Sequence, residues 1–197
     1  GVSLGVIEQL RLKLPQARFL ELAHRLDKET SGVLVLALKR SVLVELHRML
    51  REGETRKTYL TLASGDWRDP IRHVKLALHK YLTDEGERRV VVDEEGQHAH
   101  TIFRLVRRAG EFSLLEAELK TGRTHQIRVH LAALQHPIAG DDKYGDFELN
   151  RALKKRGLKR MFLHAARLEL RHPSTGAQVK LEAAMPEDLR GFLEGLD

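Results

Sequence analysis

Hydrophobic residues recur every three or four positions in four stretches of the chain, and this period predicts α-helices. The first stretch begins at Val6 and is followed by Pro15, which cannot continue a helix. The second is followed by Gly53. Glycine commonly occupies the position after the last helical residue, so Gly53 predicts the end of this helix. The four predicted helices cover residues 6–14, 41–50, 124–134 and 187–196.

Shorter apolar runs bounded by turn-forming residues predict β-strands. The predicted strands cover residues 19–23, 33–38, 58–63, 74–78, 88–92, 101–106, 112–119, 163–170 and 179–181. The runs on either side of residues 107–111 are expected to form a hairpin. Strands outnumber helices and no βαβ unit repeats, so the predicted fold class is α+β, with a mostly antiparallel mixed sheet and flanking helices.

Composition narrows the class of protein. At 197 residues, with 42% hydrophobic and 31% charged residues, the chain can bury one sizeable core. It contains no cysteine, which excludes disulfides, thiolate metal sites and thiol nucleophiles. It also has no apolar run of membrane-spanning length and no signal-peptide pattern, so we expect a cytoplasmic protein that does not bind a membrane.

The balance of charge points weakly to a polyanionic partner. The 34 Lys and Arg residues exceed the 28 Asp and Glu residues, for a net charge of +6. Part of this excess lies in residues 147–159, which either contact RNA phosphates or form an ordinary solvated helix face. No large exposed apolar stripe is evident, so we expect a monomer.

Residues 24–32, His-Arg-Leu-Asp-Lys-Glu-Thr-Ser-Gly, form the first segment with candidate chemistry. Asp27 stands between Arg25 and a turn-forming Thr-Ser-Gly, with an apolar run directly after it. This order predicts a tight loop at the edge of a sheet, where a carboxylate can be presented to a ligand. Taken alone, an Asp before Thr-Ser-Gly is more often a turn or cap residue.

Residues 122–130, Gly-Arg-Thr-His-Gln-Ile-Arg-Val-His, offer cationic partners for that carboxylate. A helix that turns its apolar residues to the core would hold Arg128 at the rim of the buried face. His125 and His130 are five residues apart, which is not the i, i+4 spacing of a helical metal pair, and no carboxylate motif accompanies them. We therefore expect no metal site.

Together the two segments resemble the signature motifs of the RluA-type RNA pseudouridine synthases. The surrounding chain is most similar to the branch that modifies large-subunit ribosomal RNA. This resemblance implies that residues 1–197 form a pseudouridine synthase catalytic domain, without the family's N-terminal motif or an upstream RNA-binding domain. It also implies isomerisation of specific uridines in that RNA, with RNA as the partner and with no cofactor.

The resemblance also implies roles for individual residues. Asp27 corresponds to the catalytic nucleophile, Arg128 to the basic residue against it, and Tyr59 to the active-site tyrosine that faces the base. Arg25 would occupy the space that the flipped base vacates, although it could also pair with Glu21 or Glu29 at the surface. The remaining candidate RNA-binding residues are His24, Arg123, His125 and Gln126.

Two other classes of protein compete with this interpretation. One is a non-catalytic RNA-binding module, which would not need Asp27, Tyr59 and Arg128 together. The other is a glycoside or nucleoside hydrolase, which usually requires paired carboxylates. Near Asp27 the only candidates for a second carboxylate are Glu21 and Glu29.

Overall fold

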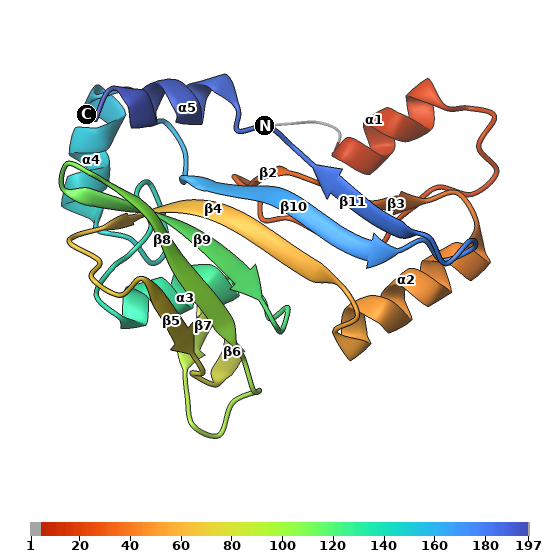
Figure 1. Cartoon of the computed structure of the whole chain (residues 1–197), viewed down its shortest axis with the longest axis horizontal. Coiled ribbons are helices and arrows are strands. Elements are labelled where there is room, and N and C mark those ends of the chain that lie inside the picture. The colour runs from red at the N-terminus through yellow and green to blue at the C-terminus, as the bar shows by residue number, and fades with distance from the viewer. Residues whose placement is uncertain (1–4, 197) are drawn as a thin grey trace.

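In the computed structural model, which describes residues 5–196, a seven-stranded sheet forms the centre of the molecule (Figure 1). Its strands are β2 (Ser31–Gly32), β4 (Arg56–Ser64), β5 (Ile71–Val74), β8 (Thr101–Ala109), β9 (Phe112–Leu119), β10 (Leu163–Arg171) and β11 (Gln178–Glu182). Six of them follow the order β11-β10-β4-β9-β8-β5 with antiparallel neighbours, and β2 pairs in parallel with β10. The predicted α+β class with a mostly antiparallel mixed sheet is confirmed.

Two small ribbons and five helices complete the part of the chain that the structure describes. The ribbons join β1 (Glu21–Leu22) to β3 (Leu36–Ala37) and β6 (Leu78–Leu82) to β7 (Arg88–Val92). The helices are α1 (Val6–Lys13), α2 (Arg40–Glu52), α3 (Gln126–Ala133), α4 (Phe147–Lys155) and α5 (Glu187–Glu194). No helix within residues 5–196 is long and apolar enough to cross a membrane.

The four predicted helices are confirmed to within a few residues, whereas three predicted strands are wrong in extent or place. Residues 19–23 and 33–38 contribute only the two-residue strands β1 and β3. Their apolar side chains instead pack with α2 and β10 in a small separate core. Val74 ends β5 and Leu78 begins β6, so residues 75–77 connect two strands.

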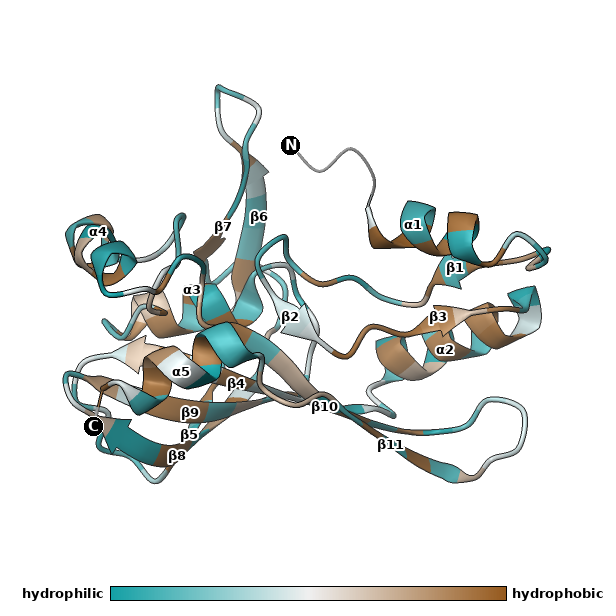
Figure 2. Ribbon diagram, turned by 90° about the horizontal axis from the view of Figure 1, so that it is seen from above, coloured by the Kyte–Doolittle hydropathy of each residue, from teal (hydrophilic) through white to brown (hydrophobic). Residues whose placement is uncertain are grey.

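The main core lies between the sheet and helices α3, α4 and α5. Its fully buried members include large side chains from strands, helices and connecting segments, among them Leu62, Trp67, Phe103, Leu115, Leu131, Leu153, Phe162 and Leu189. Figure 2 shows the apolar residues along the central strands and the mixed polar and apolar faces of α2 and α5. Burial of each such side chain stabilises the fold by roughly 1.5–3 kcal/mol.

The short strand β2 fixes the chain directly after the Asp27 loop to the first residues of β10. Ser31 and Gly32 pair with His164 and Ala165 of β10, and Ser31 Oγ lies 2.9 Å from His164 Nδ1. Gly32 has φ +118°, and a Cβ atom there would lie 2.2 Å from the carbonyl oxygen of Ala165. Only glycine therefore allows this close approach of the two backbones.

Candidate active site

The Asp27 loop, residues 23–30, connects β1 to β2 and is held by hydrogen bonds along its length. Thr30 N donates to the carbonyl oxygen of Asp27 at 2.9 Å, which closes the turn. Near its start, Val35 N donates to His24 Nε2 at 3.0 Å. Near its end, Met161 N donates to a carboxylate oxygen of Glu29 at 3.2 Å. The Asp27 side chain, 23% exposed, therefore projects from a fixed backbone.

Arg128 of α3 holds this carboxylate, as the sequence predicted. Its Nη1 donates to Asp27 Oδ2 at 3.1 Å, across 101 residues of chain. The other edge of the guanidinium makes a two-point contact with Asp141, from Nε at 2.8 Å and from Nη2 at 2.7 Å. Arg128 is more deeply buried than predicted, because its side chain is only 7% exposed rather than lying at a rim.

Asp141 is the main residue of the site whose role the sequence analysis missed. Its side chain is 1% exposed, and its Oδ1 also accepts hydrogen bonds from the backbone N–H groups of Lys143 and Tyr144. Burial opposes ionisation, but Arg128 and these donors hold the pKa of Asp141 below its usual range. Burial likewise opposes the charge of Arg128, but Asp141 and Asp27 raise the pKa of its guanidinium. Both groups stay charged.

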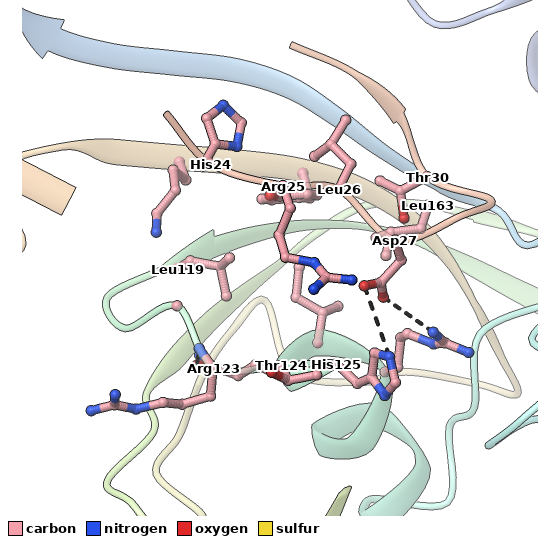
Figure 3. Close-up of a pocket in the computed structure, with 16 residues that line it drawn as sticks. His24, Arg25, Leu26, Asp27, Thr30, Leu119, Arg123, Thr124, His125 and Leu163 are labelled. Carbon is pink, nitrogen blue, oxygen red and sulfur yellow. Dashed lines mark hydrogen bonds and ion pairs between the residues drawn. The ribbon is translucent and has the colours of Figure 1, made fainter. Parts of the chain in front are cut away.

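His125 is the residue directly before α3, and its ring faces Asp27 Oδ1 from the side opposite the Asp27 loop (Figure 3). Its Nε2 is 3.9 Å from Asp27 Oδ1, beyond hydrogen-bond distance, and its Nδ1 is 2.7 Å from the Tyr144 hydroxyl. That hydroxyl oxygen accepts from Val90 N at 3.0 Å, so its own proton can point to His125 Nδ1. Burial lowers the pKa of His125, which favours a neutral ring with Nε2–H toward Asp27.

Tyr59 is on β4, where its backbone pairs with Ala117 of β9 and Ala165 of β10. Burial and, to a lesser degree, the negative charge of Asp27 raise the pKa of Tyr59 to about 12. Its phenol is therefore neutral at physiological pH. It lines the same pocket as Asp27, with an aromatic ring that can stack on a base.

These side chains line an open pocket of about 250 Å³ between the Asp27 loop, β4 and the start of α3. Figure 3 shows Arg25 extending across it with its guanidinium toward Asp27. Glu21 pairs with Arg11, and Glu29 binds the backbone of Met161, so neither is the partner of Arg25. Within residues 5–196, no group of three or more His, Asp or Glu side chains is arranged to hold a metal ion.

Gln126 lines the pocket but directs its amide into the protein, and its role in RNA binding stays a prediction. Its Oε1 accepts from Thr121 Oγ1 at 2.7 Å and from Arg123 N at 3.0 Å. Its Nε2 donates to the carbonyl oxygen of His100 and to Thr101 Oγ1. With its amide fully engaged and its surface 2% exposed, Gln126 orders the loop before α3.

His24 lines the pocket, where its Nε2 accepts from Val35 N and burial lowers its pKa, and its role in RNA binding stays a prediction. Arg123 is exposed, and its Nε donates to the carbonyl oxygen of His98. Figure 3 shows its guanidinium pointing away from Asp27. The structure thus brings Asp27, Tyr59, Arg128, Arg25 and His125 around one pocket and places Arg123 at its edge.

Comparison with known proteins identifies the class to which this fold and pocket belong. The sequence model of the RNA pseudouridylate synthase family matches residues 7–133, and the chain belongs to that family. This confirms the resemblance that the two motifs carried.

Among individual relatives, the chain is 48% identical over 198 residues to ribosomal large subunit pseudouridine synthase C of Escherichia coli (strain K12). It is 46% identical over 196 residues to the protein of the same name from Haemophilus ducreyi. Each match covers 100% of this chain, which spans only 62% and 61% of those proteins.

Solved structures support the same fold. Human RNA Pseudouridylate Synthase Domain Containing 1 matches with a TM-score of 0.80 and 28% identity, over 100% of this chain and 78% of that one. Human RNA Pseudouridylate Synthase Domain Containing 4 matches with a TM-score of 0.78 and 28% identity, over 97% of this chain and 82% of that one.

Proposed function

We propose that this chain is the catalytic domain of an enzyme that isomerises specific uridines of large-subunit ribosomal RNA to pseudouridine, with Asp27 as nucleophile and without a cofactor. The observation that carries the proposal is the carboxylate of Asp27, held at 3.1 Å by the buried Arg128 at the wall of an open pocket. The names of the relatives in Escherichia coli and Haemophilus ducreyi support the choice of RNA.

The geometry suggests which oxygen of Asp27 reacts. Oδ2 accepts from Arg128, whereas Oδ1 is 3.9 Å from His125 Nε2, beyond hydrogen-bond distance, on a residue that lines the open pocket. In the proposed reaction Oδ1 attacks C1′ of the uridine, and the electrons of the C1′–N1 bond leave with the base. The base then turns, its C5 attacks C1′, and the bond to Asp27 breaks. C5 loses its proton and N1 gains one, so the product is an isomer of the substrate.

Other residues of the pocket have supporting roles in this proposal. Arg128 holds and orients the Asp27 carboxylate through the 3.1 Å contact from its Nη1. Tyr59 stacks on the base. Arg25 fills the space that the flipped uridine leaves in the RNA, where leaving the stack costs a few kcal/mol. The proposal also includes action as a monomer in the cytoplasm, and sedimentation of the purified chain tests the monomer.

The competing functions make different demands on the site. A hydrolase of the usual kind needs a second carboxylate, but Glu29 is bound by Met161 N, Asp141 is buried against Arg128, and the exposed Asp142 lies 3.5 Å from Arg128 Nη2. An RNA-binding module needs cations rather than a buried carboxylate–guanidinium contact. The product distinguishes the three functions, because the isomerase gives pseudouridine, a hydrolase gives free uracil and a binding module leaves the uridine unchanged.

The test measures tritium release from large-subunit ribosomal RNA labelled at C5 of uridine. We expect release by the wild type and by Asp69→Asn, an exposed carboxylate outside the pocket lining, but none by Asp27→Asn. The Asp27→Asn variant should still bind the RNA. Release by Asp27→Asn would remove Asp27 from the reaction. Free uracil in place of pseudouridine would indicate a hydrolase, and binding without release by any variant would indicate a binding module.

A further inference from the structure

Lys57, another cation of the pocket wall, has no counter-charge among residues 5–196. It lies on β4 two residues before Tyr59, so both side chains emerge on the same face of the strand. Lys57 is half-buried, and burial lowers the pKa of its ammonium group. Across residues 5–196, no carboxylate lies within ion-pairing distance of it, whereas Arg128 nearby contacts Asp27 and Asp141.

Lys57 lines both the active-site pocket and a neighbouring groove of about 290 Å³. The residues common to the walls of both are His24, Lys57, Leu119, Gly122 and Arg123. The groove therefore begins where the pocket ends, on the side away from α3. A strand of RNA with one nucleotide in the pocket could continue along the groove.

The lining of this groove is cationic and contains no carboxylate. Of its four Lys and Arg residues, Lys120 is neutralised by Glu118 at 2.6 Å, and Arg51 lies 4.0 Å from Glu52. Lys57 and Arg123 have no ion pair among the described residues. Arg123 reaches only the carbonyl oxygen of His98. The two uncompensated cations are thus the two that stand where the pocket joins the groove.

Gly122 leaves space for the ammonium group at this junction. A Cβ atom at position 122 would lie 2.9 Å from Lys57 Nζ, so the nitrogen sits directly against the backbone of the loop before α3. Figure 3 shows Arg123 and Thr124 of the same loop along the edge of the pocket. A partly desolvated ammonium without a partner is unfavourable, and an anionic ligand would remove that penalty.

We propose that Lys57 binds the RNA backbone phosphate adjacent to the target uridine, at the junction between the pocket and the groove. The proposal rests on the proposed function, and it adds a phosphodiester site that neither motif contains. An ammonium group suits this role because it acts as a compact point charge toward a phosphate oxygen. Arg123 supplies a second, exposed charge at the same edge.

The salt dependence of RNA binding tests the site. In an Asp27→Asn background, which prevents turnover, Lys57→Met keeps the length of the side chain and removes its charge. Loss of one phosphate contact should lower the slope of log affinity against log salt by about 0.7–0.9 and weaken binding about threefold or more. Lys57→Arg should restore the slope. Lys180→Met, on β11 and outside the lining of the groove, should leave it unchanged.

Methylphosphonate substitution in the RNA identifies the phosphate. In a short RNA carrying a uridine that the wild type isomerises, each flanking phosphate is neutralised in turn. We expect one substitution to weaken binding to the Asp27→Asn protein and to have no further effect on the Lys57→Met double variant. An unchanged salt slope, or equal methylphosphonate effects in both proteins, would overturn the phosphate site. If the wild type still released tritium, the proposed function would stand. Absence of both release and RNA binding would overturn both.

Discussion

Arg128 donates hydrogen bonds to two carboxylates of very different accessibility, and the exposed carboxylate of Asp142 lies 3.5 Å from its Nη2. Asp141, with a 1% exposed side chain, takes two of its N–H groups, and Asp27, at 23%, takes one. The buried contact therefore orients the guanidinium, so that Nη1 is directed toward Asp27 at the pocket. This division explains how one arginine can be held rigidly and still contact the partly exposed carboxylate at the pocket.

We expect Arg128→Ala to lower the free energy of unfolding by about 3–5 kcal/mol, because it leaves Asp141 buried without its partner. Tritium release should also be lost. Urea denaturation measures the first effect. Arg88→Ala, an exposed position on β7, serves as the control and should change stability by no more than about 0.5 kcal/mol. A fully stable Arg128→Ala protein would contradict the assigned role of Asp141.

The phenol of Tyr59 reports on the charge of Asp27. Burial is the main cause of its raised pKa of about 12, and the Asp27 carboxylate adds to it. Asp27→Asn should therefore lower the pKa of Tyr59 while leaving it above the ordinary value near 10. The chain has three tyrosines, so NMR of ring-labelled protein can resolve them, with Tyr59→Phe to assign the signal. An unchanged pKa would mean that Asp27 does not face the phenol.

At the scale of elements, sequence patterns predicted the helices and long strands well because each carries its own periodicity. The two runs around the Asp27 loop, residues 19–23 and 33–38, were predicted as full strands, and this prediction was wrong. Apolar side chains from both runs pack against α2, and only two residues of each run form a strand. The Asp27–Arg128 contact could be predicted through a family resemblance. Asp141 could not, because no local pattern distinguishes a carboxylate that meets Arg128 only after folding.

The pairing of β2 with β10 depends on Gly32, and this can be tested against a matched glycine. Gly32→Ala combines a strained φ of +118° with a 2.2 Å clash against backbone, so we expect destabilisation beyond about 3 kcal/mol and loss of activity. Gly86→Ala has φ +78° and open space, so we expect a loss of about 1–2 kcal/mol and retained activity. Denaturation of both variants measures the difference, and equal losses would contradict the close approach at Ala165.

At the scale of the whole molecule, burial lowers the pKa values of His24, His125 and His130. His130 is fully buried between Thr101 Oγ1 and the carbonyl oxygen of Leu76, in the neutral form. A histidine whose pKa is lowered by folding contributes stability that is complete above its unfolded pKa, near 6.5, and is lost as the pH falls below that value.

Acidification below about pH 6.5 should therefore destabilise the protein, by at most about 1.4 kcal/mol per pH unit for each such histidine. Urea midpoints measured at several pH values and constant ionic strength give the slope. A free energy of unfolding that stays constant between about pH 6.5 and 5 would contradict the neutral, buried state of these rings.

The parallel pairing of β2 with β10 also bears on the order in which the molecule can assemble. Ser31 and its partner His164 are separated by 133 residues, so the Asp27 loop is synthesised long before the strand that fixes it. At about 5–20 residues per second, roughly 7–27 s pass between the two on the ribosome. During that interval the emerging chain carries the Asp27 carboxylate without the strand that fixes its loop. Catalytic competence would then arise late, in one step, when β10 joins the sheet.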